Sequence, residues 1–218
     1  MHLLRLDRLS AGAVRQLSSS FEDLPPTDHK DGQYRLRRYS VIELMIEPKA
    51  IKELPVNTFT QTDEYNNFQG NVERQFENID KDTLNSEGMK ELIYSFRMMN
   101  NLPPATLIDI HQMRVVTLPD GSAEVSPEGV HQDGYDFISM IGIARHNIQG
   151  GHLLVYLNKD DENFISLPLE NGHMVTLKDD ELWHNASPIV VVDKGERGYM
   201  DAFILTTKIN KRKTNANQ

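Results

Sequence analysis

The chain has 218 residues, of which 39% are hydrophobic and 25% are charged. This length favours one domain with additions over two equal domains, since a domain has roughly 150 residues. The composition excludes wholesale disorder, and a formal net charge of −9 opposes a general attraction to nucleic acid. Because the chain has no cysteine, disulfides, thiolate metal sites and cysteine nucleophiles are excluded, and a metal site must use histidine and carboxylate ligands.

Two segments have the apolar spacing of helices. Residues 10–21 begin with Ser10 as a cap and place apolar side chains on one helical face before two prolines. Residues 85–102 begin with Asn85 or Ser86 as the cap, and their apolar residues follow the i, i+3, i+4, i+7 pattern. Both segments therefore predict packing helices.

The rest of the chain has the pattern of short strands separated by turn residues, as at Gly150-Gly151 and Asn171-Gly172. Many strands at this spacing indicate a sandwich or barrel. The sequence therefore predicts a mainly β fold, a jelly roll buttressed by N-terminal helices. The expected strands are Tyr34–Ile46, Ala105–Leu118, Asp136–Ala144, His152–Leu157, Phe164–Leu167, His173–Leu177 and Met200–Lys208.

We expect residues 1–208 to form a single domain and residues 209–218 to form a flexible basic tail. The tail carries Lys211, Arg212 and Lys213 among asparagine and threonine, a composition typical of a frayed, solubilising end. Charged residues interrupt the apolar stretch near the N-terminus, and no uncharged run approaches the roughly 18 residues of a membrane span. These features predict a cytoplasmic protein that binds neither a membrane nor nucleic acid.

His131 and Asp133 stand two residues apart in the sequence Val-His-Gln-Asp-Gly. In an extended chain such residues project from the same face, so both side chains can reach one ion. Imidazole with carboxylate suits Fe(II), Mn(II) or Zn(II), given a third ligand from another strand. His184 lies where a polar turn enters an apolar strand, and strands between it and the pair would return it beside them. Other histidines lie at strand ends or turns and fit less well: His146, His152 and His173.

These residues resemble the Fe(II)/2-oxoglutarate-dependent dioxygenases, whose iron is held by an H-x-D…H triad on a double-stranded β-helix, a cupin-like jelly roll. More narrowly, the chain is similar to the bacterial free L-amino-acid hydroxylases that include L-isoleucine dioxygenase. The strings that carry this likeness are Arg35-Leu36-Arg37-Arg38-Tyr39-Ser40, Glu64-Tyr65-Asn66, Arg74-Gln75-Phe76, His111-Gln112-Met113-Arg114 and Gly150-Gly151.

The resemblance implies that His131, Asp133 and His184 hold iron, with Fe(II), 2-oxoglutarate and O₂ as cofactors. It also implies hydroxylation of a free aliphatic or thioether L-amino acid, with release of succinate and CO₂. The partner expected is thus a small molecule, and a homodimer is compatible with the sequence.

The distal carboxylate of 2-oxoglutarate needs a cation. Arg197, one strand beyond the last histidine of the triad, can hold it bidentately, and Tyr199 shares its face. The family pattern places the arginine directly before an aspartate and an apolar run, where this chain has Met200. Either the strand enters with a bulge or a shifted turn, or another cation, Arg114, anchors the co-substrate. The alternative interpretation of Arg197 is an exposed turn residue. Gln112, on the same strand face as Arg114, could orient either acid.

A free amino acid brings a carboxylate and an ammonium group into a pocket, and each needs a partner. Arg35, Arg37 and Arg74 are candidates for the substrate carboxylate, since they lie in extended, otherwise apolar segments. The alternative for the cluster at residues 35–38 is an edge strand protected by charge. The expected apolar pocket wall is Phe137, Met140, Ile141 and Ile143.

Two other functions stay open at this level. One is a cupin-type isomerase or hydrolase that uses Zn(II) or Mn(II) without 2-oxoglutarate and would act without O₂. The other is a non-catalytic, cupin-like binding module in which the histidine–aspartate pair is structural and binds no metal.

Overall fold

The computed structural model describes residues 2–47, 49–118 and 120–209. Its helices are α1 (Ala11–Ser18), the 3-10 helix η1 (Ser19–Phe21), α2 (Lys81–Leu84) and α3 (Glu87–Asn100). Its strands are β1 (Leu4–Arg8), β2 (Arg35–Leu44), β3 (Ile51–Leu54), β4 (Thr58–Phe59), β5 (Arg74–Gln75), β6 (Leu107–Val116), β7 (Ser122–Ala123), β8 (Phe137–His146), β9 (Ile148–Gly150), β10 (His152–Tyr156), β11 (Ile165–Pro168), β12 (His173–Lys178), β13 (Trp183–Ala186), β14 (Ile189–Val191) and β15 (Tyr199–Thr207).

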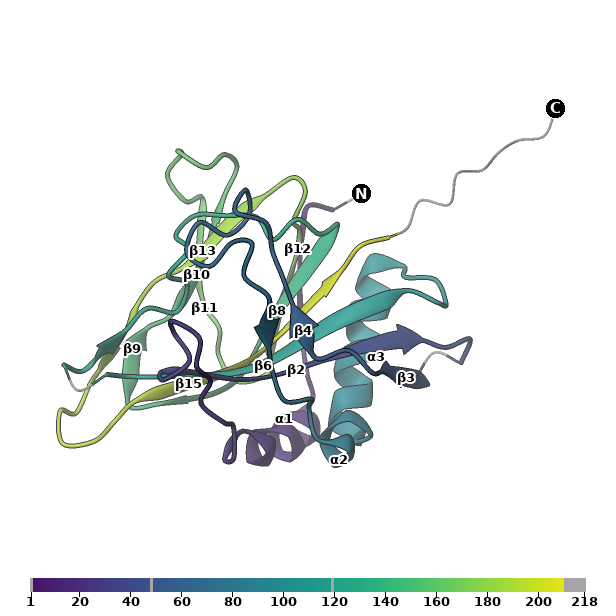
Figure 1. Cartoon of the computed structure of the whole chain (residues 1–218), viewed down its shortest axis with the longest axis horizontal. Helices are drawn as coiled ribbons and strands as arrows, with labels where there is room; N and C mark the ends of the chain where they lie inside the picture. The colour runs from purple at the N-terminus through teal and green to yellow at the C-terminus, as the bar shows by residue number, and fades with distance from the viewer. Residues whose placement is uncertain (1, 48, 119, 210–218) are drawn as a thin grey trace.

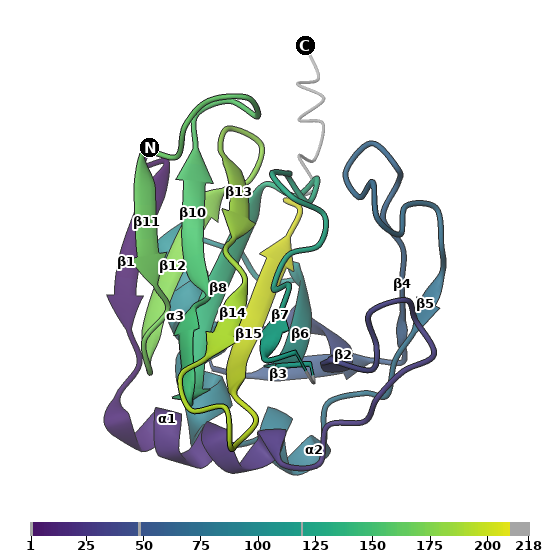
Figure 2. The same cartoon turned by 90° about the vertical axis from the view of Figure 1, so that its left-hand side faces the viewer.

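Seven strands form a large sheet in the order β1-β12-β8-β15-β6-β2-β3. A smaller sheet, β11-β10-β13, lies in front of it in Figure 2, and two short sheets, β7-β14-β9 and β4-β5, complete the strand set of the described residues. The pairings between these strands are antiparallel. Facing antiparallel sheets of this kind form a jelly roll, which confirms the predicted fold class.

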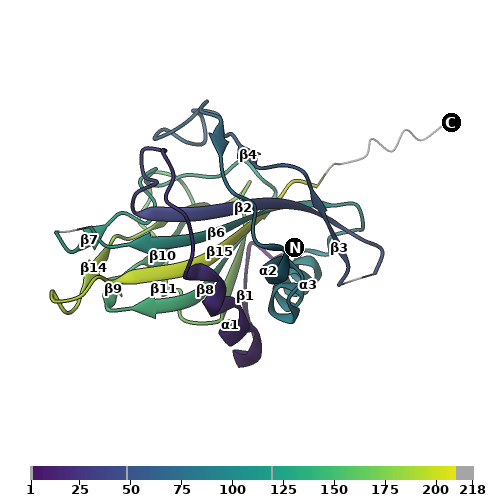
Figure 3. The same cartoon turned by 60° about the horizontal axis from the view of Figure 1, so that its bottom comes forward.

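Helices α1, α2 and α3 gather on one side of the large sheet (Figures 1 and 3). Ser10 caps α1 and Ser86 caps α3, each side chain accepting a hydrogen bond from the backbone N–H three residues on. Both helices bury their apolar faces against the sheet, where Phe21, Phe96 and Phe203 are fully buried. The predicted buttressing helices are therefore confirmed.

Alternation along the strands separates an outer core from an inner one. In β15, Phe203 and Leu205 pack with the helices, whereas Met200 and Ala202 belong to the core between the sheets. Because β-strand side chains alternate between faces, every second residue of the large sheet points toward the interior of the barrel.

The same alternation corrects the expected pocket wall in β8. Met140 faces the interior, as predicted, but Phe137, Ile141 and Ile143 pack under the helices. The sequence could not assign these faces because β8 is apolar on both of its sides.

A β-bulge interrupts β8 where it pairs with β15. The register shifts between Asp201 and Ala202, leaving Ile143 of β8 without a partner. A bulge inserts one residue and so reverses which residues face inward beyond it. Arg145 therefore lies directly opposite Met200 and shares its inward-facing side, since opposed residues of an antiparallel pair lie on one face.

None of the helices in the described residues is long and apolar enough to cross a membrane. From residue 210 on, the expected basic tail lies outside the described residues.

Candidate metal centre

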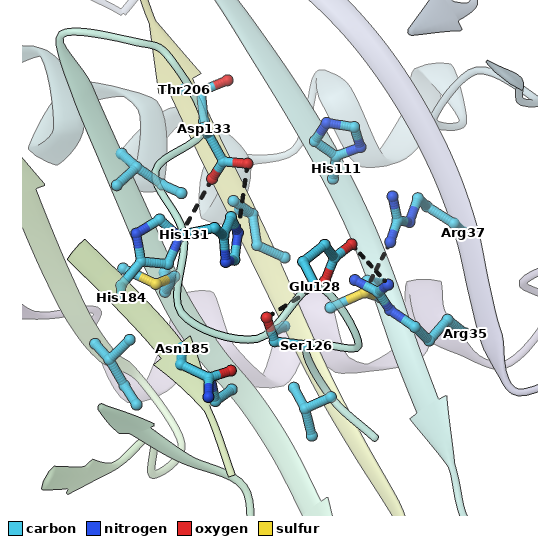
Figure 4. A pocket seen from close by; sticks show the side chains of 18 of the residues that line it. Arg35, Arg37, His111, Ser126, Glu128, His131, Asp133, His184, Asn185 and Thr206 are labelled. Carbon is cyan, nitrogen blue, oxygen red and sulfur yellow. Dashed lines mark hydrogen bonds and ion pairs between the residues drawn. The ribbon is translucent and has the colours of Figure 1, made fainter. Parts of the chain in front are cut away.

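His131, Asp133 and His184 point toward one another in Figure 4. The first two lie in the loop before β8 and the third in β13, and two backbone hydrogen bonds of 2.9 Å join His131 to His184. One ligand atom from each of the three residues lies within 4.8 Å of the other two. Nε2 of His184 is 3.3 Å from Oδ2 of Asp133, and Nε2 of His131 is 3.7 Å from Oδ1. We call these three residues the triad.

The protonation states of His131 and Asp133 suit a divalent ion. Nδ1 of His131 lies 2.9 Å from the carbonyl oxygen of Gly129, so it donates there and leaves the Nε2 lone pair free. Burial and the neighbouring His184 lower the pKa of His131, so this ring is neutral. Burial opposes the charge of Asp133, but contacts with both histidines outweigh it and lower the pKa of the carboxyl. Two imidazoles and one carboxylate are the ligand set of non-haem Fe(II) oxygenases.

Asp179 supports two members of the triad from behind. Its buried carboxylate accepts the backbone N–H groups of Asp133 at 3.0 Å and Tyr135 at 2.9 Å, and its Oδ1 lies 3.6 Å from Nδ1 of His184. Burial and the charge of Asp133 raise the pKa of Asp179 to about 6. A carboxylate behind a histidine ligand fixes the orientation of the ring and raises its basicity.

We expect Asp179→Asn to weaken Fe(II) binding by about 10- to 100-fold, the usual effect of losing such a supporting group. The amide removes the negative charge behind His184 and turns an N–H group toward backbone donors. An anaerobic iron titration measures this affinity directly. Asp180→Asn, a change at an exposed neighbour, is the matched control, and equal iron affinity in the two variants would contradict the assignment.

The triad borders a cavity between the large and the small sheet. Residues of β2, β6, β8, β10, β13 and β15 line it, together with the loop that carries His131 and Asp133. Most of the wall is apolar, as is usual for sites that bind small molecules. The apolar wall residues are Phe59, Met113, Val125, Ile138, Met140, Leu153, Leu169, Ala186, Met200, Ala202 and Ile204.

Arg35, Arg37 and Arg74 also line this cavity, and we call them the arginine wall. Nη1 of Arg35 lies 2.6 Å from Asp31 and 3.3 Å from Glu128, so its charge is balanced. Within the described residues Arg37 has no carboxylate at ion-pair distance, and its hydrogen bond goes to the sulfur of a methionine at 3.3 Å. Burial, with Arg35 adding to it, lowers the pKa of Arg37 to about 9, so the group is charged at neutral pH.

Arg74 is 2% exposed and donates to Oε1 of Gln61 at 3.2 Å. Nε2 of Gln61 donates in turn to Oδ1 of Asp133 at 2.7 Å, which connects the arginine wall to the triad. Burial and the positive charges of Arg37 and Arg74 hold the pKa of the adjacent His111 well below its usual range, so this ring is neutral. Arg37 and Arg74 are thus two buried cations with no carboxylate of the described chain at ion-pair distance, an arrangement suited to an anionic ligand.

Gln112 and Arg114, expected to hold 2-oxoglutarate, face away from the cavity. Arg114 donates to both carboxylate oxygens of Asp201 at 2.6 and 2.7 Å, and Gln112 donates to η1 on the helix side. The inward residues of β6 are His111 and Met113. Gln112 and Arg114 do not reach the cavity because side chains alternate along a strand, and the even-numbered residues of β6 lie on the outer face.

Arg197 and Tyr199 also lie off the cavity. Arg197 is exposed in the turn before β15, in line with its alternative interpretation as a turn residue. Tyr199 stacks on His146 and lies under the guanidinium of Arg114 on the outer face. The inward position next to it is filled by Met200.

The structure brings together the triad and the arginine wall from segments far apart in the sequence. The three less favoured histidines do not line the cavity. Sequence reasoning missed Gln61, Glu128 and Asp179, which come from loops and meet the predicted residues only through the tertiary fold. Among these, only Glu128 carried a signal in the sequence, as an acidic residue three positions before His131 of the H-x-D pair.

A jelly-roll barrel with a His-Asp-His cluster in its cavity defines a metal-dependent class of protein. The chain belongs to the 2OG-Fe dioxygenase family, whose sequence model matches residues 18–206. It is thus a dioxygenase that uses Fe(II), 2-oxoglutarate and O₂, and the residues at its cavity fit that ion.

Solved structures share this fold at low sequence identity. A bsmA homologue from Methylobium petroleophilum is 24% identical, with 91% of this chain and 82% of that chain covered and a TM-score of 0.79. IDO from Bacillus thuringiensis is 17% identical over 92% and 83%, with a TM-score of 0.68. The Fe(II)/α-ketoglutarate-dependent dioxygenase TqaL is 13% identical over 100% and 86%, with a TM-score of 0.69. A search of curated proteins gives no match.

Proposed function

We propose that this dioxygenase hydroxylates a free L-amino acid with an aliphatic or thioether side chain, converting 2-oxoglutarate to succinate and CO₂. His131, Asp133 and His184 would hold the iron. The observation that carries the proposal is the arginine wall, whose uncompensated cations share a mostly apolar cavity with the triad and with a buried acid.

The charges of the cavity match a zwitterion. Arg37 and Arg74 would hold the substrate carboxylate, because both are buried cations in need of an anion. Glu128 would receive the ammonium group. Burial opposes its charge, but Arg35 together with other neighbouring groups, Arg37 among them, outweighs burial and lowers the pKa of Glu128, so the carboxylate is ionised. In Figure 4 it lies between the arginines and the triad.

The apolar wall supports the choice of side chain. Ile138, Met140 and Ile204 line the cavity from β8 and β15, and they offer an aliphatic group contacts without unpaired polar atoms. Such a wall distinguishes one methylene by only about 1–3 kcal/mol. Several aliphatic amino acids should therefore be accepted, whereas the charged ends should be recognised strictly.

The chemistry supplied by the bound iron is the oxidative decarboxylation of 2-oxoglutarate by O₂, with one oxygen atom passing to the substrate C–H bond and the other to succinate. The side chains of the cavity would position the substrate and the ligands of the ion. Arg37 and Arg74 would fix the carboxylate so that the side chain lies toward the triad. Gln61, by donating to Oδ1 of Asp133, holds that carboxylate in one orientation, and the apolar wall keeps water from the reacting carbon.

We expect iron-loaded protein to release succinate with isoleucine, leucine and methionine at graded rates, and not with their N-acetyl or amide derivatives. Blocking either end removes the partner of Glu128 or of the arginines. Succinate and hydroxylated product are quantified together by mass spectrometry, and succinate formed without substrate sets the background.

Three outcomes would overturn the proposal. A peptide, nucleobase or carrier-bound acyl group that stimulates succinate release more than every free amino acid would refute the substrate class. Equal rates with blocked and free amino acids would refute the roles of the charged groups. Product formation without O₂ would favour a metal-dependent isomerase or hydrolase.

A further inference from the structure

We propose that Arg145 of β8 binds the distal carboxylate of 2-oxoglutarate, in place of an arginine on β15. The inference rests on the use of 2-oxoglutarate by the family and, for the assignment of the arginine wall to a second anion, on the proposed function. Calorimetry with 2-oxoglutarate in the absence of an amino acid tests it separately from the substrate panel.

The bulge in β8 turns Arg145 toward the inner face of the sheet. Ile138 and Met140 ahead of the bulge line the cavity, and unbroken alternation would turn Arg145 to the outer face. The register shift instead sets Arg145 opposite Met200, whose side chain lines the cavity. Nη1 of Arg145 lies 3.8 Å from the sulfur of Met200, so the guanidinium reaches across to the inner side of β15.

A glycine lets the guanidinium pack close behind the cavity wall. Gly151 lines the cavity, and a Cβ atom built on it would lie 3.2 Å from Nη1 of Arg145. Its φ of +64° is in the left-handed region, which also favours glycine. The guanidinium therefore stands directly behind two cavity-lining residues, Gly151 and Met200.

The positive charge of Arg145 is available to a ligand. Nη2 donates to the carbonyl oxygen of Gly150 at 2.6 Å, which orients the side chain. In the part of the chain that the structure describes, no carboxylate lies within ion-pair distance of it. A half-buried arginine held by one carbonyl and lacking an anionic partner is suited to a carboxylate ligand.

Two anions have to be bound at separate places during one reaction. The arginine wall provides one cationic position, and 2-oxoglutarate needs a second for the carboxylate that does not approach the metal. The sheet register separates the two: Arg145, Met200, Val115 and Arg35 lie side by side on β8, β15, β6 and β2. Since Arg35 is already balanced by Asp31 and Glu128, Arg145 is the cation left for the co-substrate.

The test measures 2-oxoglutarate binding to the full chain loaded with Fe(II) under anaerobic conditions, by calorimetry. We expect Arg145→Met to weaken 2-oxoglutarate binding at least about 30-fold, which corresponds to the lower limit of about 2 kcal/mol for removing one partner of a buried charged contact. Iron affinity, measured separately, should be unchanged. Arg197→Ala is the control and should bind 2-oxoglutarate like the parent.

A swap sharpens the test. In the double variant Arg145→Met, Met200→Arg the guanidinium moves to the paired position on β15, and we expect most of the 2-oxoglutarate affinity to return. Arg145→Gln keeps a donor for the Gly150 carbonyl and serves if the methionine variant does not fold, with the same loss expected. Unchanged 2-oxoglutarate affinity in either single variant would overturn the proposal, and a large loss in Arg37→Ala instead would move the anchor to the arginine wall.

Discussion

Replacing His131, Asp133 or His184 by alanine should reduce succinate release to background. Each side chain provides one of three ligand atoms that lie within 4.8 Å of one another, and two ligands cannot hold the ion as three do. We expect iron affinity to fall by more than about 100-fold, beyond what the loss of a supporting residue costs. Metal content after gel filtration and succinate yield measure the two effects.

The fold should survive these changes because the triad borders a cavity and not the packed core. Thermal unfolding followed by circular dichroism checks this point. His146→Ala is the matched control, since that side chain is 44% exposed and pairs with Glu196 outside the cavity. Full succinate production by any triad variant would show that the ligand assignment is wrong.

Arg37→Ala should weaken binding of the amino-acid substrate by about 2–5 kcal/mol, the effect of removing one partner of a buried charge pair. Arg37 has no carboxylate of its own within the described residues, so its charge is free for a ligand. The change should raise KM for the amino acid and lower kcat/KM, while the affinity for 2-oxoglutarate stays close to that of the parent.

Arg197→Ala removes the same type of side chain from an exposed turn and should leave KM unchanged. If Arg37→Ala kept its KM for every accepted amino acid, the arginine wall would not be the substrate site. If it lost 2-oxoglutarate affinity instead, the wall would hold the co-substrate.

Short-range sequence signals predicted the elements whose ends are set by interactions between neighbouring residues. The serine caps at Ser10 and Ser86 mark the helix starts, because a cap acts on its own first turn. Strand β1 escaped notice because Arg5 and Asp7 break its apolar run. In the structure these charged residues alternate with Leu4 and Leu6 along the edge of the large sheet, where charge protects an open strand.

The candidate site likewise contains residues that the local sequence identifies and residues whose position depends on strand pairing. His131 and Asp133 are neighbours on an extended chain, so their joint reach toward one ion is a local property. Arg114 was misplaced because a sequence does not show which face of β6 turns inward. Arg145 was missed because the bulge that reverses its direction arises from pairing with β15, and no local motif encodes that pairing.

The position of β1 affects how the barrel is assembled during folding. This strand pairs with β12, with Leu4 opposite Leu177, so its contacts span nearly the whole described chain. Contacts between residues so distant in sequence form slowly, because a long loop must close first. During synthesis β1 emerges well before its partner, and its two free edges stay available to other strands. Once β12 has been synthesised, β1 pairs with it and covers the outer edge of β12. A strand that is synthesised early therefore joins the sheet late.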